Sequence, residues 1–395
     1  MTTPLRISMV GTRGVPAAYG GFETAVEEIG ARLVERGHAV TVYCRNATGE
    51  RRDTWRGMTL KHLPALHFKS AETLSHTALS ATHIAMTHNT DIAFVFNAAN
   101  SPLLPLLRAC GIPTALHVDG LEWMRDKWSG AGRNYYRFAE RFGVRNADAL
   151  IADAQGIADY YTSEYNAPTE LLTYGTQIVD GAAHDRLAEL DLEPNGFHLV
   201  VARFEPENHV DVIVRGYQRS TATLPLVVVG SAPYAHRHGE QITEAAAGDS
   251  RIRFLGGLWD QQLLDQLYAN AFSYLHGHSV GGTNPSLLRA MGGAAPVLAW
   301  DVGFNREVAG TEAGYFATPA QLSALLENAE ADAASFGERG ERLRERARNT
   351  YDWDDVADGY EDLGLRIFAG ETIHARAAGH RRTIPRTRTR EQRLT

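Results

Sequence analysis

The chain has 395 residues, 44% of them hydrophobic, and a formal net charge of −8. This length suggests two domains of ordinary size or one large one, with enough apolar residues for buried cores. The negative charge argues against nucleic-acid binding by the whole chain, and the presence of only two cysteines argues against a disulfide framework and a cysteine-built metal site. No stretch has the length of a membrane span, and the start is too short and polar for a signal peptide, so we expect a cytoplasmic protein.

The first βαβ unit begins with an apolar strand over residues 5–10. A glycine-rich loop follows, then a helix over about 23–36 with an apolar stripe, and a strand over 38–44. The loop glycines lack the spacing of the dinucleotide-binding fingerprint, which argues against a nicotinamide dehydrogenase. Gly20 and Gly21 lie just before the helix, where a substrate phosphate or hydroxyl could rest; a flexible turn is the alternative.

Polar residues follow the middle one of three further strands, which we expect at residues 91–97, 113–118 and 147–154. His117 and Asp119 are candidate site residues, because the carboxyl ends of strands in doubly wound sheets face the ligand crevice. A histidine satisfied within the core is the alternative for His117. Residues 121–128 carry two tryptophans among charges and could form a lid over an acceptor or the start of an amphipathic helix.

Periodicity weakens around residues 180–195, and we place a domain boundary after residue 188. Strands and helices alternate again further on, which predicts a second parallel sheet. The predicted fold class is α/β, with two Rossmann-like doubly wound domains, residues 1–188 and 189–350, facing a cleft, and a closing helix over 351–370. Residues 371–395 contain seven arginines and few apolar residues, which predicts a disordered tail that could touch anionic lipid or stay solvated.

The stretch HGHSVGGTNPSLLRAMGG, residues 276–293, has the pattern of a phosphate site. A buried strand leads through a glycine turn into a capped helix with a proline in its first turn. The free N–H groups and positive dipole end of such a helix favour an anion. We interpret the stretch as the diphosphate clamp of a nucleotide-sugar enzyme, with an ordinary strand–turn–helix crossover as the alternative. The turn would be Gly281 and Gly282. Thr283 or Asn284 would cap the helix, and Pro285 would lie in its first turn.

Five segments together resemble the bacterial retaining glycosyltransferases of family four, which have the two-domain GT-B fold. Within this family, the chain most resembles the rhamnosyltransferase-like branch that opens with GTRGVPAxYGGFET. The five segments are residues 11–24, 117–123, 202–208, 281–291 and 304–308. The resemblance implies that Arg203 binds the donor diphosphate and that His117 lies beside the donor sugar. It also implies that the distal phosphate is held by the backbone of Gly282, Thr283 and Asn284, with Gly20 and Gly21 near the diphosphate or the acceptor.

Three residues depart from the broader family pattern. Asn208 stands where a lysine often supplies a second cation, and Gly281 and Arg289 stand where the family has two glutamates. A carboxylate binds a ribose diol by accepting two hydroxyl protons, whereas a guanidinium only donates. Either the ribose is held elsewhere, or the donor is a dTDP-sugar such as dTDP-rhamnose, whose deoxyribose lacks one hydroxyl. Arg289 could replace the missing cation or face solvent, and low or absent activity stays open; we include all three residues, with Asp119, among the predicted donor-binding positions.

The predicted reaction is transfer of a hexose from a nucleotide-diphosphate sugar to a hydroxyl of a cell-surface glycan or lipid-linked acceptor. We expect no metal or other cofactor, since no acidic or His/Cys cluster is visible in the sequence. The basic tail could add a peripheral contact at the inner face of the plasma membrane. A sugar-nucleotide epimerase of the same fold and a catalytically weak nucleotide- or glycan-binding homologue are the alternatives.

Overall fold

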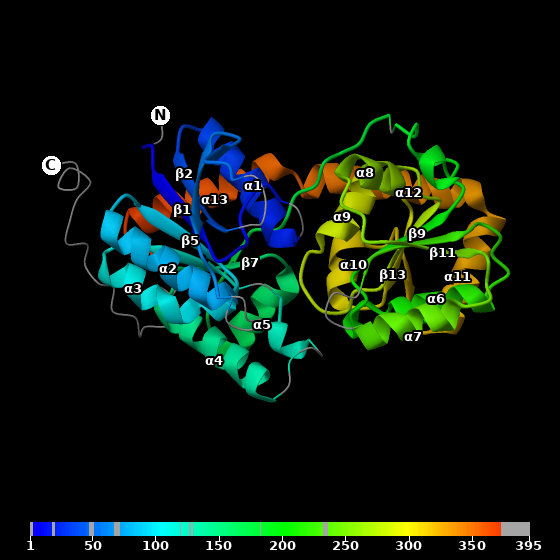
Figure 1. Cartoon of the computed structure of the whole chain (residues 1–395), viewed down its shortest axis with the longest axis horizontal. Coiled ribbons are helices and arrows are strands. Elements are labelled where there is room, and N and C mark those ends of the chain that lie inside the picture. Colours follow the sequence, from blue (N-terminus) through cyan, green and yellow to red (C-terminus); the bar gives the residue numbers. More distant parts are fainter. Residues whose placement is uncertain are drawn as a thin grey trace. The chain divides into compact units, whose positions relative to one another are not determined.

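The computed structural model describes residues 3–17, 20–46, 51–66, 72–118, 120–125, 128, 130–181, 183–231 and 236–372 (Figure 1). The chain forms two compact units. The second is Tyr174–Asp352, and the first combines the chain up to Thr173 with the chain from Trp353 onward. Within the described ranges, no helix has the length and apolar character needed to cross a bilayer.

The first unit is built on a sheet of eight strands among its described residues. Their spatial order is β3 (Thr54–Trp55), β4 (Met58–Leu63), β2 (Ala39–Arg45), β1 (Arg6–Val10), β5 (Ile92–Phe96), β6 (Thr114–His117), β7 (Ala149–Ala152) and β8 (Glu170–Leu171). Neighbouring strands are parallel except β3 and β4, which form an antiparallel hairpin. Every residue of β5, β6 and β7 is buried, as expected for parallel strands covered on both faces.

Helices cover both faces of this sheet (Figure 1). On one face, α1 (Gly21–Glu35) packs against α13 (Trp353–Phe368), and α13 contacts β5 and β6. The other face carries α2 (Glu72–Thr87), α3 (Leu104–Ala109), α4 (Gly130–Asn146) and α5 (Gln155–Tyr165), with the short 3-10 helices η1 (Ala98–Leu103) and η2 (Glu122–Met124) beside α4.

The second unit has six parallel strands among its described residues. Their order is β11 (Ile252–Gly256), β10 (Leu226–Val229), β9 (His198–Val201), β12 (Ser273–His276), β13 (Val297–Trp300) and β14 (Gly314–Phe316). The helices on one face are α6 (Val210–Arg219), α7 (His236–Ala246) and α11 (Pro319–Ala331). The helices on the other face are α8 (Gln261–Ala269), α9 (Pro285–Gly292), α10 (Gly303–Ala309) and α12 (Ala333–Thr350). The described part of this unit also contains the 3-10 helices η3 (Leu187–Leu190) and η4 (Pro206–Asn208). Two parallel-sheet units confirm the predicted α/β class.

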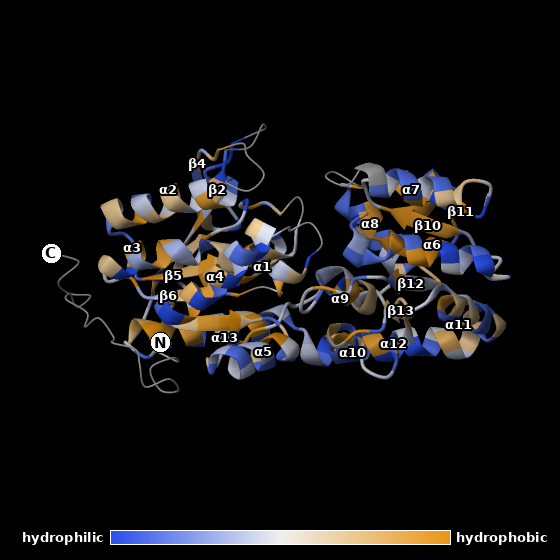
Figure 2. Ribbon diagram, turned by 90° about the horizontal axis from the view of Figure 1, so that it is seen from below, coloured by the Kyte–Doolittle hydropathy of each residue, from blue (hydrophilic) through white to orange (hydrophobic). Residues whose placement is uncertain are grey.

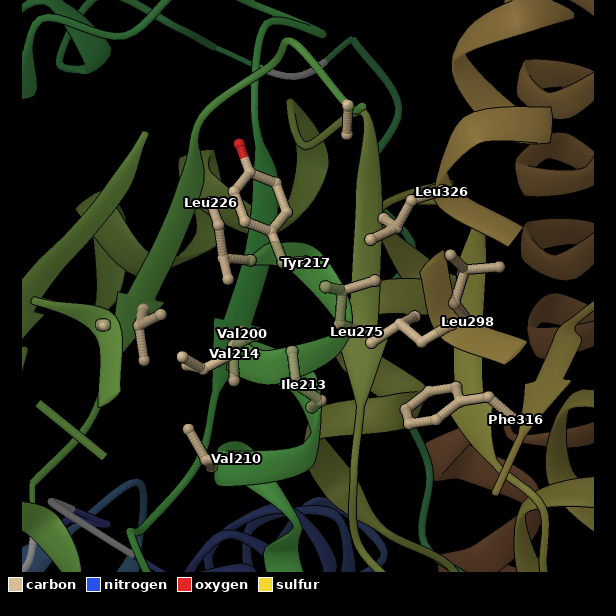
Figure 3. Close-up of a cluster of buried hydrophobic side chains, with 14 of the residues drawn as sticks. Val200, Val210, Ile213, Val214, Tyr217, Leu226, Leu275, Leu298, Phe316 and Leu326 are labelled. Carbon is tan, nitrogen blue, oxygen red and sulfur yellow. The ribbon is translucent and has the colours of Figure 1, made fainter. Parts of the chain in front are cut away.

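The core of the second unit shows why α6 lies where it does. Val210, Ile213, Val214 and Tyr217 recur at helical spacing, and all four are buried against the strands (Figure 3). Leu275 of β12 points into this same cluster. Since side chains alternate along a strand, the neighbouring residues of β12 face α8 and α9 instead. The hydropathy colouring shows apolar strands, such as β10, between helices with polar outer surfaces (Figure 2).

The boundary between the units precedes the predicted one after residue 188. Residues 174–188 belong to the second unit because they bind the two residues that flank α8: the Asn270 side chain donates to the Ala183 carbonyl at 2.9 Å, and Arg186 pairs with Asp260 at 2.6 Å. The predicted closing helix is α13, whose Tyr360 ring lies 5.1 Å from that of Phe94 in the first unit. Most of the predicted basic tail, residues 373–395, lies outside the described residues.

Candidate functional site

The start of α9 has the local structure that a phosphate site requires. Asn284 is the N-cap: its Oδ1 accepts from the backbone N–H of Ser286 at 3.0 Å and from the Ser286 hydroxyl at 2.7 Å. Pro285 occupies the first helical position, and the first turn contains no acidic residue. The positive end of the helix dipole is therefore not compensated by a carboxylate of its own first turn.

The glycine turn before α9 leaves room above the backbone. Gly281 has a φ of +141°, and a Cβ added there would meet no atom within 4 Å. Gly282 and the buried Thr283 continue the turn to the Asn284 cap. A ligand can therefore approach this backbone closely at the position where the family pattern has its first glutamate.

Arg203 lies in the loop after β9, where it was predicted to supply a cation. Arg203 is half-buried, and among the described residues its guanidinium has no hydrogen-bond or ion-pair partner. Its backbone carbonyl accepts from the Asn208 side chain at 2.8 Å and from the N–H of Glu205 at 2.8 Å. The loop is thus fixed through its backbone while the charged group stays available.

Asn208 is 1% exposed, and its amide group donates inward to Arg203. This geometry makes Asn208 a brace for the arginine loop. Direct contact between Asn208 and the donor stays a prediction, and the inward direction of the side chain weighs against it.

Three contacts join the arginine loop to the clamp turn. The Ser279 N–H donates to the Glu207 carbonyl at 2.9 Å, and His209 Nδ1 bonds the Gly277 carbonyl at 2.9 Å. A Cβ on Gly277 would collide with the Asn208 carbonyl. The loop that carries Arg203 and the turn that leads into α9 therefore meet at the carboxyl edge of the sheet, between the adjacent strands β9 and β12.

The sequence did not predict the residues that hold these loops in place at the edge of the sheet. The His209 ring stacks on Trp300 at 3.6 Å, with 12° between the planes. Asn305 is buried, and its amide group donates to the carbonyls of His278 and Trp300, both at 2.9 Å. Asn305 belongs to a segment that carries the family resemblance, but nothing in the spacing showed that it joins two loops.

His276 ends β12 and is fully buried beside this turn. Its ring stacks on that of His278 at 4.5 Å, and its Nδ1 lies 3.3 Å from the Tyr274 hydroxyl. Burial lowers the pKa of His276 to about 3, so the ring is neutral at physiological pH. His276 therefore adds no positive charge beside the turn.

Arg289 is directed at α8. Its guanidinium pairs with Asp265 at 2.6 Å and donates to the side chain and the backbone carbonyl of Gln261, both at 3.1 Å. The predicted donor contact of Arg289 is untested, and these three interactions weigh against it. They also occupy the carboxylate of Asp265, so neither residue offers a free acceptor pair for a ribose diol.

In the first unit, His117 lies at the carboxyl end of β6 and is buried between two rings. Phe96 stacks on it at 5.7 Å, and Phe22 from the first turn of α1 meets its edge at 5.0 Å. Burial lowers the pKa of His117 to about 3. The Phe22 contact brings the start of α1, and with it Gly20 and Gly21, to His117. Asp119 lies outside the described residues.

Gly20 is the N-cap of α1, with a φ of +114°, and Gly21 is the first helical residue. A Cβ on Gly20 would collide with the carboxylate of Glu23, which accepts from the backbone N–H of Arg13 at 3.0 Å. The first turn of α1 therefore carries a negative charge that the first turn of α9 lacks. A neutral hydroxyl suits this helix start better than a phosphate does.

A metal site is not formed by the described residues, since no group of three or more His, Cys, Asp or Glu among them could hold an ion.

Two family models match the chain, one in each unit. The Glycosyl transferase 4-like domain matches residues 20–174, and Glycosyl transferases group 1 matches residues 197–331. With the two parallel-sheet units, these matches define the chain as a glycosyltransferase of the GT-B type.

Individual relatives agree with this class. Alpha-maltose-1-phosphate synthase of Mycolicibacterium smegmatis is 26% identical over 92% of this chain and 100% of its own length. Sucrose-phosphate synthase from Thermosynechococcus elongatus superposes with a TM-score of 0.78 at 18% identity, over 93% of this chain and 100% of its own. HepE of Anabaena, in complex with UDP-glucose, has a TM-score of 0.73 at 15% identity, over 91% and 99% of the two chains.

Proposed function

We propose that this glycosyltransferase moves a hexose, with retention of configuration, from a nucleoside-diphosphate sugar to a hydroxyl group. One observation carries the proposal: the Arg203 guanidinium, which has no partner among the described residues, and the start of α9, which has no acidic residue, lie on two loops that bind each other. Donors aimed in advance at a leaving diphosphate lower the barrier without reorganising during the reaction. The neutral His117 would accept a hydrogen bond from a sugar hydroxyl.

The donor nucleotide we propose is thymidine diphosphate, with rhamnose as the first sugar to test. Support comes from position 289, where a guanidinium tied to Asp265 stands in place of a carboxylate that would grip a ribose diol. A deoxyribose lacks one hydroxyl of that diol, so a deoxyribose donor loses less binding affinity when the carboxylate is replaced. UDP is the competing nucleotide, because HepE of Anabaena binds UDP-glucose.

The acceptor we propose is a hydroxyl of a growing cell-surface glycan or of a lipid-linked precursor. A phosphorylated sugar is a second candidate, favoured by the alpha-maltose-1-phosphate synthase that aligns along 92% of this chain. Peripheral membrane contact through residues 373–395 stays a prediction.

A thermal-shift screen against UDP-, GDP-, ADP- and dTDP-sugars tests the donor. A ligand at 100 times its dissociation constant adds about 2.7 kcal/mol of stability, which for a unit of this size raises the unfolding temperature by about 5–10 °C. Preference for UDP- or GDP-sugars over dTDP-sugars would remove the thymidine proposal. The absence of a shift with any nucleotide sugar would remove the function itself.

Acceptor-dependent release of nucleotide then separates transfer from the alternatives. Transfer predicts release that rises with added glycan, lipid-linked acceptor or sugar phosphate. An epimerase would convert the donor with no acceptor present, and a binding homologue would show the thermal shift without turnover.

A further inference from the structure

The outer face of α4 carries a row of arginines. They recur every fourth residue, and all four are exposed: Arg133, Arg137, Arg141 and Arg145. Side chains four residues apart lie one above the other on a helix. The only carboxylate of α4, Glu140, is buried and binds the hydroxyls of Tyr160 and Tyr165. A chain with a net charge of −8 thus concentrates positive charge on one helix face.

These arginines do not contribute ion pairs to the described part of the fold. Among the described residues none of the four makes an ion pair, and the Arg137 guanidinium rests over the Trp123 ring at 4.4 Å. Exposed arginines elsewhere do pair, as Arg342 does with Glu312 at 2.6 Å. Like charges at four-residue spacing destabilise a helix slightly, so the row has a small cost to the stability of α4.

An aromatic row runs beside the arginines. Phe138 is 51% exposed, and its ring lies 5.6 Å from Phe142 and 6.5 Å from Tyr135, both half-buried. Two further exposed apolar residues, Leu106 and Met124, come from α3 and η2, which both pack against α4. Arginine guanidinium groups beside exposed aromatic and aliphatic side chains are typical of a helix that lies in the headgroup region of a bilayer.

We propose that α4 docks the first unit on an anionic phospholipid surface, with the arginines on headgroup phosphates and Phe138 between the headgroups. Charge complementarity selects an anionic partner, and the aromatic row selects a lipid surface over a soluble polyanion, which offers nothing apolar to cover. This surface is separate from the basic tail and independent of which sugar nucleotide the second unit binds.

The test compares binding of the full-length protein to vesicles of phosphatidylcholine with about 30% phosphatidylglycerol and to pure phosphatidylcholine vesicles. Each arginine near an anionic surface strengthens binding about fivefold, so Arg133→Gln, Arg141→Gln and Arg145→Gln together should weaken it about 100-fold. The matched control makes the same charge change in the second unit, at exposed arginines that are ion-paired: Arg215→Gln, Arg342→Gln and Arg348→Gln. The control should bind as the wild type does, apart from a small uniform effect of net charge.

A second variant tests the apolar contact. Phe138→Ser removes a half-exposed ring without a charge and should weaken binding about tenfold, at high salt as well as low. It also keeps the proposal testable if the triple variant fails to fold.

Four results would overturn the proposal. The first is equal binding of the α4 triple variant and the wild type, which would assign the contact to another surface such as the tail. The second is equal binding of the wild type to anionic and to neutral vesicles, and the third is no binding to either. The fourth is displacement of the protein from vesicles by soluble polyphosphate while Phe138→Ser has no effect.

Discussion

Replacing Arg203 with alanine should remove catalysis and leave the fold intact. The guanidinium has no partner among the described residues, so its loss breaks no internal hydrogen bond. The contacts that shape the loop use the Arg203 carbonyl, which alanine keeps: Asn208 and Glu205 still donate to it at 2.8 Å. We therefore expect thermal stability close to that of the wild type.

The size of the catalytic loss follows from the role of the guanidinium. Removing one pre-positioned donor to a developing anion typically costs about 2.7–4 kcal/mol in the barrier. This corresponds to a loss of about 100- to 1,000-fold in kcat. Arg203→Lys keeps a point charge but loses the planar two-donor fork, so we expect it to retain more activity than alanine, at about one tenth of the wild type.

Nucleotide release with a saturating sugar nucleotide and acceptor measures the effect, with circular dichroism to confirm folding. Arg219→Ala is a matched control, because Arg219 is an exposed arginine at the far end of α6 that also lacks a partner in the described chain. The control should keep normal turnover. A folded Arg203→Ala enzyme within fivefold of wild-type kcat would refute the proposed leaving-group contact.

Three further predictions concern the cap, the histidine and the metal. Asn284→Asp keeps an N-cap oxygen and should preserve stability, yet it places a carboxylate at the proposed phosphate site and should raise the KM for the donor at least about tenfold in steady-state kinetics. His117 cannot take up a proton in the folded unit until the pH nears its pKa of about 3, whereas the unfolded chain does so below pH ~6.5. His117 should therefore contribute about 1.4 kcal/mol per pH unit to the fall in unfolding free energy below pH ~6.5, and urea titrations of His117→Asn should show a pH slope smaller than that of the wild type by about this amount. Turnover should survive EDTA, and its loss with recovery on adding a divalent ion would contradict the metal-free site.

Elements fixed by nearby residues could be predicted from the sequence. The glycine turn, the cap and the proline at the start of α9 all depend on contacts within a few residues, and the structure has Asn284 as the cap and Pro285 next to it. The same holds for α6, whose apolar stripe at helical spacing is buried as expected. Element types and approximate bounds followed from such patterns because their causes are local.

Features that depend on distant residues could not be predicted. The assignment of residues 174–188 to the second unit rests on bonds such as that between Asn270 and Ala183, 87 positions apart. The role of Asn305 rests on two carbonyls that its own segment does not contain. Position 208 was interpreted as a missing cation, whereas its side chain holds the arginine loop, and only the fold shows in which direction it points.

The two glycine-rich loops that precede α1 and α9 look equivalent in sequence, and electrostatics separates them. At α1, the Glu23 carboxylate already lies against the Gly20 cap and binds the Arg13 N–H, so an added phosphate would meet a negative charge. At α9, the cap is a neutral asparagine, and an unpartnered arginine stands on the adjoining loop. We infer that the diphosphate binds at α9 and that α1, beside the neutral His117, faces a sugar hydroxyl. Exchange of the two charge patterns, with an acid at α9 and none at α1, should abolish donor binding at α9, because the new carboxylate would repel the diphosphate.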